Sequence, residues 1–142
     1  MDIILAFLSA TFAALVTITA KLVLNRLDEG FVPVVTAVRA VIMAILLVTV
    51  AIFSTNVRQR ITSLQPKDWL YILLAGLFGA ISWLAYFWAL KLTSNVRSVY
   101  AIDKLSIVLI VILTWLIFKK PVTLTAILGA ILMFAGVFLI GL

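Results

Sequence analysis

The sequence contains no cysteine and no histidine, and only five of its 142 residues are aspartate or glutamate. Without cysteine, the chain has no disulfide framework and no thiolate metal site. The lack of histidine and the few carboxylates also argue against a structural zinc site or a carboxylate metal centre. Because the sequence shows no nucleophile–base pair and no glycine loop for phosphate, we predict neither an enzymatic activity nor a cofactor.

Long apolar runs dominate what the sequence does contain. Hydrophobic residues make up 66% of the chain and its mean hydropathy is +1.35, whereas a soluble domain is only about half apolar. A transmembrane helix needs roughly 20 apolar residues, and several runs reach this length. We therefore predict an all-α integral membrane protein with a single domain over residues 1–142. Its five predicted helices cover about 3–24, 32–53, 68–91, 96–118 and 122–142.

Basic residues outnumber acidic ones, because 11 Lys and Arg give the chain a net charge of +6. Most of them flank the apolar runs, where they are typical of headgroup and topology anchors rather than of a nucleic-acid surface. The flanking charges are almost equal on the two sides of the membrane, so the positive-inside rule selects no orientation. Two hypotheses stay open: dual topology with an antiparallel homodimer, or one dominant orientation.

Four charged residues lie inside the apolar runs. Lys21 is near the end of the first run, Arg39 is early in the second, and Asp103 and Lys104 are neighbours in the fourth. Each charge at the bilayer centre costs roughly 2.5–3.5 kcal/mol on insertion scales, so such residues normally face a polar interior. Alternating helix directions put all four in the same half of the membrane. We therefore predict that they converge at a common depth.

Each of these charges also has a structural alternative. Arg39 is either an anion-binding fork or the ion-pair partner of Asp103. Asp103 either takes up a proton or binds a substrate amine, or it is a fixed counter-ion for Arg39 or Lys104. Lys21 is either a third cation of the site or a side chain that snorkels to the interface. Because neighbouring residues are about 100° apart around a helix, we expect either Asp103 or Lys104, but not both, to face the cavity.

Aromatic residues and glycines add to this picture. Trp83, Tyr86 and Tyr100 fall in the same predicted layer as the charges, where their rings could stack on a cargo. Both tyrosines also suit the aromatic belt at a membrane interface. We therefore expect Trp83 to line the cavity, whereas the roles of Tyr86 and Tyr100 stay open. Gly129 and Gly136 share one face of the fifth predicted helix, which indicates close helix packing or a dimer contact.

The charged and aromatic positions lie in short motifs: Ile102-Asp103-Lys104-Leu105-Ser106, Ala20-Lys21, Thr36-Ala37-Val38-Arg39 and Ser82-Trp83-Leu84-Ala85-Tyr86-Phe87. With these motifs the chain resembles, over essentially its whole length, the short five-helix members of the EamA family in the drug/metabolite transporter superfamily. The resemblance implies a ten-helix inverted-repeat transporter, of which this chain is one half. It also implies a dimer with a second copy or with a similar half.

The predicted layer carries surplus positive charge, because Lys21, Arg39 and Lys104 outnumber Asp103. Anionic or zwitterionic cargo is therefore favoured. We predict a secondary transporter of a small metabolite in the cytoplasmic membrane of a bacterium or archaeon. Its expected partners are the lipid bilayer, the cargo and a second half, with no nucleic acid. Two alternatives stay open: a subunit of a lipid-carrier flippase, and a non-transporting membrane subunit that stabilises a partner.

Overall fold

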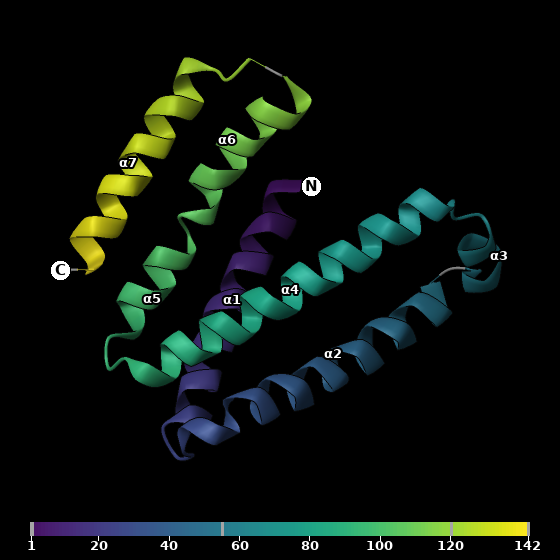
Figure 1. Ribbon diagram of the computed structural model, residues 1–142, viewed down its shortest axis with the longest axis horizontal. Helices are drawn as coiled ribbons and strands as arrows, with labels where there is room; N and C mark the ends of the chain where they lie inside the picture. Colours follow the sequence, from purple (N-terminus) through teal and green to yellow (C-terminus); the bar gives the residue numbers. More distant parts are fainter. Residues whose placement is uncertain (1, 55, 120, 142) are drawn as a thin grey trace. The chain divides into compact units, whose positions relative to one another are not determined.

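The computed structural model describes residues 2–54, 56–119 and 121–141. Throughout these ranges the regular structure is helical and contains no strand (Figure 1). Leu142, the last residue of the predicted fifth helix, and Met1, the first of the predicted domain, lie outside the described residues. The prediction of an all-α membrane protein is confirmed.

Five segments of the described chain are long and apolar enough to cross a bilayer. The first is α1, Asp2–Leu24; the second is α2, Val32–Ser54, preceded by the short helix η1, Glu29–Phe31. The third is α4, Pro66–Leu92, and the fifth is α7, Leu124–Gly141. Most large apolar side chains on these helices are exposed, as expected where lipid tails rather than water surround them.

The fourth span is interrupted in its middle, which differs from the continuous helix that the sequence predicts. It consists of α5, Val96–Asp103, and α6, Ser106–Phe118. Between them the main chain tightens, because the amides of Lys104, Leu105 and Ile107 donate to carbonyls three residues earlier, at 3.1, 2.9 and 3.1 Å. Such a 3₁₀ turn within a helix often marks a functional hinge. It places Asp103 and Lys104 at the interruption.

Polar residues start several of these helices as their types predict. Asp68 accepts a hydrogen bond from the amide of Gln65 at 2.9 Å where α4 begins, and Asn95 accepts one from the amide of Ser98 at 3.4 Å where α5 begins. Asp28 accepts a hydrogen bond from the amide of Gly30 at 2.9 Å where η1 begins. Each side chain satisfies an amide that has no partner inside the first helical turn.

A short helix, α3 (Val57–Thr62), lies between the second and third spans, where the sequence predicts only a polar loop. It is six residues long and carries two arginines. A segment this short shows too little apolar periodicity for a helix to be predicted from the pattern. It connects α2 and α4 (Figure 1).

The chain forms two compact units. Unit 1 comprises Met1–Lys21 with Leu92–Leu142, and unit 2 comprises Leu22–Lys91. In unit 1, α7 packs beside α5 and α6 (Figure 1). The buried residues of unit 1 are Thr17, Ala20, Ala101 and Val137, and those of unit 2 are Leu24, Val32, Phe87 and Leu90.

Candidate functional site

Arg39 of α2 lies against the aromatic side chains of α4 in unit 2. The central carbon of its guanidinium is 3.7 Å from the centroid of the Trp83 ring and 5.3 Å from that of Phe87. Trp83 in turn meets the rings of Tyr86 and Phe87 edge-on, with centroids 6.1 and 5.6 Å apart. A cation over an aromatic face gains about 0.5–2 kcal/mol, more when it is shielded from water. These rings therefore hold the guanidinium in place.

The same arginine and tryptophan line a cavity between α2 and α4. Its volume is about 490 Å³, within the range of about 300–1,000 Å³ that is typical of small-molecule sites. Its wall is mostly apolar or small, and Arg39 is the charged residue in it. The lining consists of Pro33, Thr36, Ala37, Arg39, Ala40, Met43, Ala44, Leu47, Gly76, Ala80, Trp83 and Leu84.

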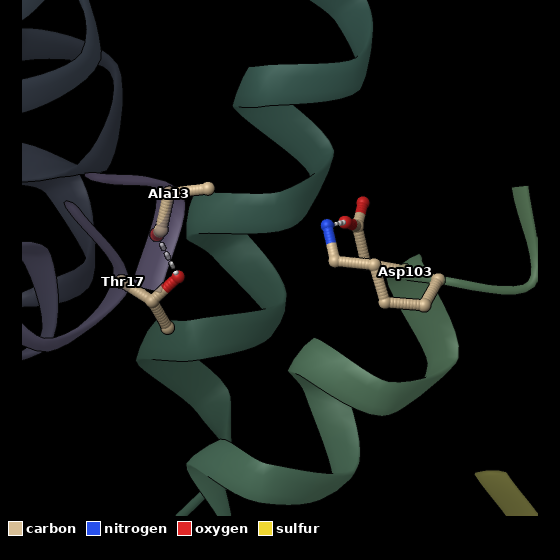
Figure 2. Close-up of polar contacts among 4 residues, drawn as sticks. Ala13, Thr17 and Asp103 are labelled. Atoms are coloured by element: carbon tan, nitrogen blue, oxygen red, sulfur yellow. Dashed lines mark hydrogen bonds and ion pairs between the residues drawn. The ribbon is translucent and has the colours of Figure 1, made fainter. Parts of the chain in front are cut away.

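Asp103 and Lys104 form an ion pair at the interruption between α5 and α6 in unit 1. The Lys104 Nζ is 3.0 Å from Asp103 Oδ2 (Figure 2), and it also lies 4.5 Å from the centroid of the Tyr100 ring. Because adjacent helix positions are about 100° apart, these two side chains were predicted to point in different directions. They meet because the four-carbon stem of lysine is long and flexible enough to bend back toward its neighbour.

Two lysines near helix ends bind main-chain carbonyls. The Lys21 Nζ donates to the carbonyl of Thr93 at 2.6 Å, and the Lys91 Nζ donates to the carbonyls of Leu24 and Leu27 at 2.9 and 2.6 Å. The last carbonyls of a helix have no partner within it, so a lysine is a suitable donor there. The two roles expected of Lys21 from the sequence remain predictions.

Thr17 of α1 is a buried polar residue with a hydrogen bond along its own helix. Its hydroxyl donates to the carbonyl of Ala13 at 3.0 Å (Figure 2). A threonine in a membrane helix commonly satisfies its hydroxyl in this way, one turn back along its own helix. This contact gives no evidence that Thr17 meets a cargo.

Gly129 and Gly136 have open space around them within the chain. A methyl group added at either position would meet no atom within 4 Å. Within unit 1, no described atom therefore lies close to this position at either glycine. Their role in helix packing or in a dimer contact remains a prediction.

The structure thus groups six of the seven residues expected at the site, all but Lys21, into two clusters, and Phe87 joins the first of them. The first, in unit 2, is Arg39 with Trp83, Tyr86 and Phe87. The second, in unit 1, is Tyr100 with Asp103 and Lys104. That the two clusters converge on one cargo remains a prediction, as does a direct pair between Arg39 and Asp103. In the described ranges no three metal-binding side chains of His, Cys, Asp or Glu gather.

Lys91, Phe87 and Thr36 were given no role from the sequence, although Phe87 and Thr36 stand in the motifs quoted above. Lys91 stands in the last turn of α4, a position equally typical of a lysine that anchors at the membrane interface. Phe87 is fully buried beneath the guanidinium of Arg39, and its spacing of four residues from Trp83 on one helix face was the signal available. Thr36 lies one turn before Arg39 on α2, which is the same kind of signal.

Comparison with known proteins adds to this geometry. The EamA-like transporter family matches residues 1–142. An uncharacterized transporter in the cobO 3' region of Sinorhizobium sp. is 36% identical over 135 residues, which cover 95% of this chain and 92% of that relative. No solved structure matches the chain. With its five apolar spans, the chain belongs to the EamA-like transporter family and is an integral membrane transporter.

Proposed function

We propose that this transporter moves small anionic or zwitterionic metabolites by secondary transport, and that Arg39 binds the negative group of the cargo. The observation that carries the proposal is the position of Arg39 in the cavity wall, with its guanidinium carbon 3.7 Å from the centroid of the Trp83 ring. A guanidinium presents five N–H donors in a fork that matches a carboxylate or phosphate. An anion in this cavity would therefore meet a positioned donor group.

Unit 2 supplies no counter-ion for Arg39 within its described residues. Its acidic residues are Asp28, Glu29 and Asp68, and two of them, Asp28 and Asp68, each accept a hydrogen bond from a main-chain amide near a helix start. No carboxylate of this described part forms an ion pair with Arg39. An anionic ligand in the cavity would supply the opposite charge that unit 2 does not.

Two cations of the predicted layer are left after the ion pair is formed. Lys104 and Asp103 neutralise each other across 3.0 Å, whereas Lys21 keeps its positive charge when its ammonium donates to a main-chain carbonyl. The surplus that favours an anion therefore comes from Arg39 and Lys21. A bound zwitterion would place its carboxylate at Arg39 and leave its ammonium for another part of the site.

The proposal includes assembly from two five-helix halves. Transporters of several folds place the cargo between two repeats of inverted topology, and this chain contains five spans in its described part. The open faces of Gly129 and Gly136 on α7 support a contact with a second copy, in antiparallel or parallel orientation. The relative from Sinorhizobium supports a bacterial cytoplasmic membrane.

Transport by the purified protein in liposomes tests this function. Labelled carboxylates, amino acids and amines are offered outside vesicles that contain the unlabelled compound, and protein-free vesicles provide the background. We expect exchange of carboxylates or amino acids and no exchange of amines. Exchange of amines alone contradicts the proposal. Movement of labelled lipid-linked sugars without any water-soluble cargo supports a flippase subunit instead.

A further inference from the structure

The cavity between α2 and α4 has one charged lining residue, Arg39, in an otherwise mostly apolar wall. From this composition we infer that the preferred cargo is an organic anion with an apolar body, and that Gly76 determines how large this body can be. The inference rests on the proposed function and specifies its substrate class. Three observations support it: the geometry of Arg39, the composition of the cavity wall and the space at Gly76.

The charged group of the cavity is a guanidinium held against an aromatic ring. Carbon atoms in contact are separated by about 3.5–4.0 Å, and the central carbon of Arg39 is 3.7 Å from the centroid of the Trp83 ring. At this distance the guanidinium is in contact with the indole face. A guanidinium has five N–H donors spread around its plane, and one ring contact cannot occupy all of them. One anionic group can therefore bind at the edge of this stack.

The remainder of the cavity offers few polar partners. The hydroxyl of Thr36 donates to the carbonyl of Val32 at 2.8 Å, so its proton is already used. Apart from Arg39, Thr36, Trp83 and Pro33, the wall consists of alanine, methionine and leucine side chains and of Gly76, from α2 and α4. A cargo rich in hydroxyl groups would lose its hydrogen bonds to water here without replacement. An apolar body would lose none.

Small residues create the space for this body. Gly76 and Ala80 lie one turn apart on α4, and both line the cavity. A Cβ at Gly76 would meet no atom within 4 Å, so a larger side chain fits there without strain and extends into the cavity. Gly79 has the same open surroundings, but it does not line the cavity. The two glycines therefore form a matched pair for substitution.

A lipid chain or a helix of a second copy is a less suitable occupant. Either would cover the N–H donors of Arg39 with apolar groups, and a buried donor without a partner costs about 1–3 kcal/mol, more when it is charged. An anion with an apolar body can bind the guanidinium of Arg39 and cover the apolar wall at once. Charge complementarity thus favours a small amphipathic anion over a purely apolar occupant.

Binding to the full chain in lipid nanodiscs tests this inference. The probes are 1-naphthoate, acetate and 1-naphthylmethylammonium, with empty nanodiscs subtracted. We expect 1-naphthoate to bind at least tenfold more tightly than either of the others. Gly76→Leu should weaken its binding by about tenfold or more, since even one methylene in an apolar pocket changes discrimination 10- to 200-fold. Gly79→Leu should leave binding unchanged, and Ala80→Leu repeats the test should Gly76→Leu not insert.

The outcomes separate this inference from the proposed function. Equal binding of acetate and 1-naphthoate, or equal effects of Gly76→Leu and Gly79→Leu, overturns the apolar body and leaves anion transport standing. Binding of the ammonium probe as tight as that of 1-naphthoate shows an apolar groove without charge selection, and overturns both. Tighter binding of 1-naphthoate that is lost in Gly76→Leu alone supports the inference.

Discussion

Replacing Lys91 with methionine removes the ammonium that joins two main-chain carbonyls. Lys91 donates to Leu24, the last residue of α1, at 2.9 Å and to Leu27 at 2.6 Å. The Leu24 carbonyl has no partner further along its own helix, because α1 ends there. Methionine keeps a long unbranched side chain and a similar helix propensity. The substitution therefore deletes the donor with little change in packing.

The expected loss follows from the two bonds. A hydrogen bond to a charged group contributes about 1.5–3 kcal/mol to stability, so two of them would contribute about 3–6 kcal/mol if fully shielded. Lys91 is half-buried, so water satisfies part of what is lost and weakens the original bonds. We expect the free energy of unfolding to fall by about 2–3 kcal/mol.

Unfolding in mild-detergent micelles, followed by circular dichroism as sodium dodecyl sulfate is added, measures this change. Lys67→Met is the matched control, because Lys67 is an exposed lysine in the first turn of the same helix. We expect it to change stability by no more than about 0.5 kcal/mol. Equal unfolding midpoints for Lys91→Met and Lys67→Met would refute the reasoning.

Two further predictions concern the second cluster and the glycines. Asp103→Asn should abolish transport while membrane insertion stays intact, and normal transport by this variant would remove Asp103 from the site. Gly136→Leu should lower dimer cross-linking without changing unfolding, since a methyl group there meets no atom within 4 Å. Cross-linking at the level of the native chain would exclude this face as the dimer contact.

The spans could be predicted because the bilayer imposes one length and one composition on them. The interruption at Lys104–Leu105 could not, since no glycine or proline marks it and the apolar run continues to Phe118. It consists of three hydrogen bonds that shift from the fourth to the third preceding carbonyl. Such a change depends on local packing, about which the hydropathy of the sequence gives no information.

The candidate site was predictable in its residue types more than in its contacts. The cost of a buried charge singles out Arg39 from the sequence alone, and the position of Trp83 suggests a cavity. That the two side chains stack depends on the distance between α2 and α4, which the sequence does not give. Lys21 shows the same limit, because a lysine near a helix end is equally suited to the interface and to a carbonyl of another segment.

Transport by Arg39→Gln tests the central claim most directly. Losing a charged hydrogen bond to the cargo costs about 1.5–3 kcal/mol, and 1.4 kcal/mol is a factor of ten, so kcat/KM for an anionic cargo in liposomes should fall about 10- to 100-fold. Arg60→Gln, at an exposed arginine of α3 outside the cavity, should transport normally. The account predicts loss in the first variant alone; equal anion transport by both variants and the native chain would contradict it.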